Sequence, residues 1–117
     1  MLGPIKIYKE QRQFPRVSFD SPLRFQIKST HKFGSTVCRD ISEGGIRFLT
    51  EDFVPIGTSI VLEVNLGVLP KVINAVADVV WSQKMAHSDR YQVGLKFCEM
   101  DEPYHQDVCE YVKSRRF

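Results

Sequence analysis

From residue 22 onward, apolar and polar side chains alternate in one short segment after another. In LRFQIK, residues 23–28, Leu23, Phe25 and Ile27 alternate with arginine, glutamine and lysine. A period of two puts successive side chains on opposite faces of a strand, so that one face is buried and the other meets water. This segment therefore predicts a half-buried antiparallel strand.

Five further segments show strand patterns and are separated by turn residues. They are STVCRDI (35–41), GIRFLT (45–50), SIVLEVNL (59–66), VINAVADVVW (72–81) and YQVGLKF (91–97). In the fifth of the six segments, the alternation assigns Trp81 to the same face as Val79. Six strands with turns between them favour a small antiparallel barrel or sandwich.

The last part of the chain has a different period. Tyr104, Val108, Tyr111 and Val112 recur at the spacing of an amphipathic helix, and Asp101 suits the N-cap. We predict a helix over about residues 101–115 that covers one opening or face of the barrel.

The domain organisation follows from these patterns. Residues 1–20 carry charges and two prolines without sustained periodicity, and they predict a flexible leader. Residues 21–117 then form the barrel domain with its helix. A chain of 117 residues has the size of one domain.

The net charge limits the classes of ligand, and the hydropathy limits the location of the protein. The formal net charge is only +2, whereas proteins held to a nucleic-acid polymer by backbone charge usually have a stronger basic excess. We therefore expect no nucleic-acid polymer as ligand, while a small dianion remains compatible. No apolar run has the length of a signal peptide or a membrane span, which predicts a cytoplasmic protein without membrane insertion.

The residues that usually form catalytic or metal centres show no such pattern. The three cysteines lack a C-x-x-C spacing and the three histidines lack ligand spacing, so neither a disulfide framework nor a metal site is predicted. No nucleophile elbow, phosphate loop or metalloprotease helix is present. We expect a protein that is not an enzyme and holds no cofactor or metal.

Two polar segments are not explained by the barrel pattern. DISEGG, residues 40–45, puts a carboxylate, a hydroxyl and two glycines between two strands, and RQFPR, residues 12–16, puts two guanidinium groups ahead of the first strand. Each alone has an ordinary explanation, since Asp, Ser and Gly form turns and paired arginines form solvated patches. Together they offer phosphate donors, a carboxylate acceptor and a backbone free of side chains.

A guanine nucleotide needs these groups. Guanidinium forms paired hydrogen bonds to phosphate and stacks on flat rings. It also pairs with O6 and N7 of guanine, while a carboxylate accepts hydrogen bonds from the ring N–H and the exocyclic amine. The two segments therefore indicate a guanine-nucleotide site.

The spacing Arg12-x-x-x-Arg16, followed by Asp40-x-Ser42-x-x-Gly45, resembles the paired signature of the PilZ domain family, which binds the bacterial second messenger cyclic di-GMP. YQVGLKF is also similar to the family's last strand. The resemblance covers nearly the whole chain, and it implies a mainly β fold, a six-stranded antiparallel β-barrel with the C-terminal helix packed on it.

The resemblance also implies roles for the arginines. Arg12 and Arg16 would grip the phosphates and stack against or pair with guanine. In the family this segment folds over the nucleotide on binding, which agrees with the flexible leader predicted for residues 1–20.

In the second motif, the resemblance implies that Asp40 binds a guanine edge and that Ser42 hydrogen-bonds the ligand or braces the loop. Gly45 would let the backbone approach closely. Gly44 is not required by the family's pattern, but its position in the loop makes it a further contact.

Two more residues bear on the site. Many relatives carry an arginine immediately before the first motif arginine, where this chain has Gln11. Glutamine brings no charge, so one nucleotide or a stacked pair is left open, and affinity is expected to be lower. Trp81 ends the fifth strand, where an indole is either core or a surface on which a base stacks.

We therefore expect a monomeric or homodimeric bacterial receptor that orders its leader on binding cyclic di-GMP. The changed surface would act on an effector protein in motility, adhesion or exopolysaccharide control. One alternative is a PilZ-like protein-interaction module with weak or no nucleotide binding. Another is a small barrel for single-stranded nucleic acid, against which the net charge of +2 weighs.

Overall fold

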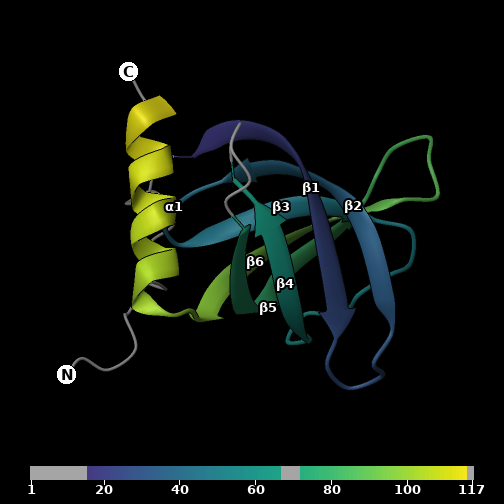
Figure 1. Ribbon diagram of the computed structural model, residues 1–117. Coiled ribbons are helices and arrows are strands. Elements are labelled where there is room, and N and C mark those ends of the chain that lie inside the picture. Colours follow the sequence, from purple (N-terminus) through teal and green to yellow (C-terminus); the bar gives the residue numbers. More distant parts are fainter. Residues whose placement is uncertain (1–15, 67–71, 116–117) are drawn as a thin grey trace.

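The alternating segments form a closed barrel (Figure 1). The computed structural model describes residues 16–66 and 72–115. Its elements in chain order are β1 (Val17–Ile27), β2 (Phe33–Ile41), β3 (Gly45–Thr50), β4 (Ser59–Asn65), β5 (Val72–Lys84), β6 (Tyr91–Glu99) and α1 (Glu102–Arg115). The predicted six-stranded antiparallel barrel with a C-terminal helix is confirmed.

Every neighbouring pair of strands is antiparallel, and the order around the barrel is β1-β2-β3-β6-β5-β4. Pairing of β4 with β1 closes the barrel. Residues 51–58 connect β3 to β4, which are not neighbours. Every strand therefore has a neighbour on each side along part of its length, so the sheet has no edge strand.

The barrel interior is filled by the side chains of alternate residues along each strand. On β4, Ile60, Leu62 and Val64 are completely buried, while Val61 and Glu63 between them are exposed. Across the interior, Phe25 stacks on Phe48 with ring centroids 5.5 Å apart. The apolar residues of the alternating pattern thus point into the barrel, and the residues between them point outward.

The first strand begins earlier than predicted. Val17 pairs with Ile41 and Ser18 with Asp40, so residues 17–20, which were assigned to the leader, belong to β1. A register shift between Ser18 and Ser21 interrupts the ladder there, and this bulge hides the period of two. Residues 1–15 of the predicted leader lie outside the described residues.

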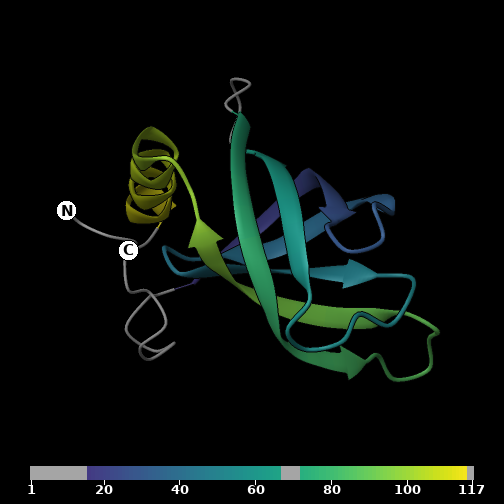
Figure 2. The ribbon, with the colours of Figure 1, turned by 90° about the horizontal axis from the view of Figure 1, so that it is seen from below.

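Helix α1 packs beside one end of the barrel (Figures 1 and 2). Val108 and Val112 are completely buried, as the predicted stripe requires. The Asp101 carbonyl accepts the first helical hydrogen bond, from His105 N at 3.0 Å, which is the N-cap position. In the described part of the chain, no helix has the length and apolar character that a membrane crossing requires.

Candidate functional site

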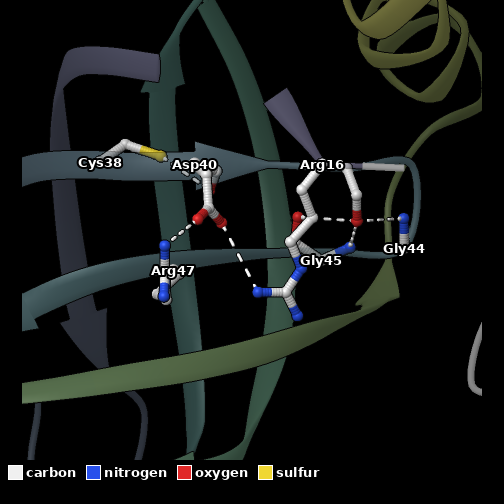
Figure 3. A network of polar contacts seen from close by, with 7 residues as sticks. Arg16, Cys38, Asp40, Gly44, Gly45 and Arg47 are labelled. Carbon is white, nitrogen blue, oxygen red and sulfur yellow. Dashed lines mark hydrogen bonds and ion pairs between the residues drawn. The ribbon is translucent and has the colours of Figure 1, made fainter. Parts of the chain in front are cut away.

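The Asp40 carboxylate lies between two arginines on the outer surface of the barrel (Figure 3). Arg47 Nη2 donates a hydrogen bond to Asp40 Oδ2, and Arg16 Nη1 lies 3.8 Å from Oδ1. Only 10% of the Asp40 side chain is exposed, against 40% for Arg16 and 34% for Arg47. The site is therefore a mostly buried anion with two partly exposed cations beside it.

Strand pairing explains this arrangement. Arg16 immediately precedes β1, and Asp40 stands on β2 opposite Ser18. Arg47 stands on β3 directly opposite Asp40, so both side chains project from the same face. The fold therefore brings the second arginine of RQFPR beside Asp40.

A tight turn follows the carboxylate. Ser42 Oγ accepts hydrogen bonds from Gly44 N at 3.2 Å and Gly45 N at 3.1 Å, and Ser42 N donates to Gly45 O at 2.9 Å. The buried Ser42 hydroxyl therefore stabilises the turn. Its hydrogen bonds hold the backbone of the two glycines in one conformation.

Gly45 allows β3 and β6 to come together. A Cβ at this position would lie 2.2 Å from the backbone oxygen of Leu95. The adjacent Gly44 carbonyl accepts a hydrogen bond from Phe97 N at 3.0 Å. In the structure, therefore, the absence of a side chain at Gly45 makes room for the neighbouring strand.

The turn also contacts the helix. Burial raises the pKa of Cys109 on α1, and the charge and hydrogen bond of Glu43 raise it further, to about 11. At the same end of the barrel, Asn74 Nδ2 lies 3.5 Å from Tyr104 Oη. Helix α1 therefore contacts both the Asp-Ser-Gly-Gly turn and the start of β5.

A second thiol lies beneath the carboxylate. Cys38 Sγ is 3.4 Å from the Asp40 carbonyl oxygen and is fully buried. Burial is the main reason that its pKa is raised, and the Asp40 charge is the next. Cys38 is a neutral core thiol at physiological pH, as expected for a cysteine in this environment.

Trp81 lies on the outer face, which corrects the strand pattern predicted for it. Val79 pairs with the inward Leu95, but a register shift follows and Trp81 pairs with the outward Gly94. A Cβ at Gly94 would lie 2.3 Å from Trp81 Nε1, so the indole occupies the space that the glycine leaves free. Trp81 is half-buried and not part of the barrel core.

The remaining site residues predicted from the sequence, Gln11 and Arg12, lie outside the described residues. Arg47 was not predicted. The turn contained the signal for it: if residues 42–45 close a hairpin, Ile41 faces Ile46 and Asp40 faces Arg47, as observed.

Other parts of the described barrel do not add to this site. A cavity of about 780 Å³ is lined mainly by residues of β1, β2 and the end of β3, and its lining includes Phe25, Phe33 and Phe53 but none of the predicted site residues. Within residues 16–66 and 72–115, no group of three or more His, Cys, Asp or Glu side chains could hold a metal ion.

A closed six-stranded barrel with a terminal helix and an Asp-x-Ser-x-x-Gly turn at one end defines a class of small β-barrel domain, and the family comparison identifies it. The family model described as PilZ domain matches residues 10–114. This chain belongs to the PilZ domain family. No curated protein matches the sequence.

Solved structures agree with the family. The Bacillus subtilis inhibitor of motility MotI/DgrA is 22% identical with a TM-score of 0.77, covering 92% of this chain and 51% of that one. The PilZ domain of Escherichia coli YcgR with c-di-GMP is 16% identical with a TM-score of 0.66, covering 91% and 92%. The K. pneumonia MrkH–c-di-GMP complex is 16% identical with a TM-score of 0.70, covering 91% and 52%. This chain thus spans about half the length of MotI/DgrA and MrkH.

Proposed function

We propose that this protein is a cytoplasmic cyclic di-GMP receptor, not an enzyme, that regulates an effector protein. The observation that carries the proposal is the Asp40 carboxylate flanked by Arg16 and Arg47, next to the braced Ser42–Gly45 turn. Two PilZ structures similar to this one, those of YcgR and MrkH, contain c-di-GMP. Both support the same ligand here.

The proposed roles follow the chemistry of each group. Arg12 and Arg16 hold phosphate and guanine through charge-assisted hydrogen bonds. Asp40 accepts hydrogen bonds from the N–H groups of a guanine edge. Gly44 and Gly45 present a backbone without side chains next to the ligand.

The regulatory step uses the segment ahead of β1. Arg16 is the last residue before the barrel and stands beside Asp40. A ligand that engages both Arg12 and Arg16 orders the predicted leader against the barrel and shifts its conformational equilibrium. The resulting surface is recognised by an effector in motility, adhesion or exopolysaccharide control.

Calorimetric titration tests the proposal. We expect saturable heat with cyclic di-GMP and none with GTP at the same concentration. The stoichiometry distinguishes one bound nucleotide from a stacked pair per chain, the question that Gln11 raises. The absence of heat and of any thermal shift at high micromolar ligand would overturn the proposal.

The second candidate is a PilZ-like protein-interaction module with weak or no nucleotide binding. It is favoured by exposed aromatic side chains at the cavity, Phe33 at 75% and Phe53 at 58% exposure. A titration without heat would leave this function as the better account, because exposed apolar groups of this kind mark interaction surfaces.

Trp81 provides an optical test of the extent of the site. Its ring lies over Gly94 of β6, and Gly94 pairs with Arg47, the residue opposite Asp40. The ring is therefore about two strand spacings, or about 10 Å, from Asp40, and a ligand bound at Asp40 would come close to it. Because Trp81 is the one tryptophan of the chain, we expect cyclic di-GMP to quench the emission, and Trp81→Leu to weaken binding about tenfold. Saturable binding with unchanged emission would remove Trp81 from the site.

A further inference from the structure

Arg47 stands in the site although it belongs to neither motif that defines it. The strand register places it opposite Asp40 on one side and opposite Gly94 on the other. The space above Gly94 is taken by the Trp81 ring. Arg47 is therefore confined between a carboxylate and an indole, and its guanidinium remains at the surface beside Asp40 (Figure 3).

The hydrogen-bonding capacity of this pair is only partly used. A guanidinium has five N–H donors, and the described structure gives Arg47 one side-chain acceptor, Asp40 Oδ2. Its Nε is buried and has no hydrogen-bond partner within the described residues. Because Nε is buried, the donors left for a ligand are the remaining N–H groups of the two Nη atoms, at the partly exposed end of the side chain.

Asp40 has capacity left as well. A carboxylate offers about four lone-pair positions. Arg47 uses one of them, and Arg16, 3.8 Å away, is close to the other oxygen. Two acceptor positions therefore remain for a ligand.

The free groups of the pair match one purine. The edge of guanine presents two donors, the exocyclic amine and the ring N–H, followed by two acceptors, O6 and N7. Asp40 supplies two acceptors and Arg47 supplies adjacent donors, in the complementary order. Adenine has an amine donor where guanine has O6, so it would set a donor against the guanidinium donors.

We propose that Arg47 determines base specificity, donating to O6 and N7 of the guanine whose N–H groups bind Asp40. The inference rests on the proposed cyclic di-GMP site and adds a guanine-selecting residue contributed by the barrel itself. Arg47 thereby excludes cyclic di-AMP, a ligand with the same phosphates and overall shape.

The test separates donation to the base from support of Asp40. Arg47→Lys keeps a positive charge beside Asp40, and hence the fold, but replaces the planar fork of donors with a point charge. The matched control is Arg24→Lys, the same chemical change at an exposed β1 residue that pairs with Glu63 away from the site. Dissociation constants for cyclic di-GMP and cyclic di-AMP are measured by calorimetry on wild type and both variants, with thermal unfolding to compare their stability.

We expect Arg47→Lys to remain folded and to lose selectivity for cyclic di-GMP over cyclic di-AMP by about 10- to 100-fold, the range that a bidentate contact to guanine provides. Arg24→Lys should retain the wild-type ratio. If Arg47→Lys keeps the wild-type ratio, Arg47 only holds Asp40 and the inference fails while the receptor function stands. If wild type binds neither nucleotide, the proposed function fails, and the inference with it.

Discussion

Replacing Arg16 with alanine is expected to reduce cyclic di-GMP affinity by about 100-fold or more. Arg16 is the one motif arginine within the described residues, and it lies beside the Asp40 carboxylate, the group proposed to bind guanine. Loss of its guanidinium removes two or more charge-assisted hydrogen bonds to the ligand, each worth about 1.5–3 kcal/mol. Calorimetric titration of the variant measures the loss directly.

The same substitution should leave the fold nearly unchanged. The Arg16 side chain is 40% exposed, and its contact with Asp40 is a long ion pair at 3.8 Å. Pairs of this kind contribute at most about 1 kcal/mol to stability. The melting temperature of Arg16→Ala is therefore expected to stay within a few degrees of wild type, so that weak binding is not a consequence of unfolding.

Two controls make the Arg16 result specific. Gln11→Ala removes a neutral side chain from the same segment and should weaken binding much less. Arg24→Ala removes an arginine that is 76% exposed and far along β1, and should have no effect on affinity. Equal losses in Arg16→Ala and Gln11→Ala would contradict the roles assigned to these residues.

The alternation in the sequence was enough to predict the strands of a small antiparallel barrel or sandwich, because each strand has one solvent-exposed and one buried face. Val64, for example, is completely buried while its neighbour Glu63 is exposed. The closed barrel was implied by the resemblance to the PilZ family. Local deviations from the alternation could not be predicted. The register shift between Val79 and Trp81 adds a residue to β5, and only the partner strand reveals which face Trp81 then occupies.

The same limit applies to the site. Arg16, Asp40 and Ser42 could be chosen from motif spacing, because their chemistry is local to two short segments. Arg47 required knowledge of the cross-strand register, since its position beside Asp40 depends on how many residues the turn contains. Residues that come from adjacent strands are therefore the ones that sequence motifs alone omit.

Gly45→Ala is expected to have the largest effect on stability and to abolish binding as well. The added Cβ would lie 2.2 Å from the Leu95 backbone oxygen, and backbone on a paired strand has little freedom to move away. Overpacking of this kind costs about 1–3 kcal/mol, which corresponds to a fall in melting temperature of roughly 5–15 °C. The shift of β3 also displaces the Ser42–Gly45 turn and, two residues further on, Arg47.

Substitution of a second glycine serves as a control, because it distinguishes the collision at residue 45 from the general effect of replacing a glycine. Gly57 has φ +93° and open space around its Cβ position, so Gly57→Ala introduces backbone strain without a collision. It should cost about 1–2 kcal/mol, and cyclic di-GMP affinity should be unchanged because residue 57 lies in the β3–β4 loop. Thermal unfolding and calorimetry on the two variants give the comparison. A Gly45→Ala protein with wild-type stability and affinity would show that β3 and β6 can separate at this point without disturbing the site.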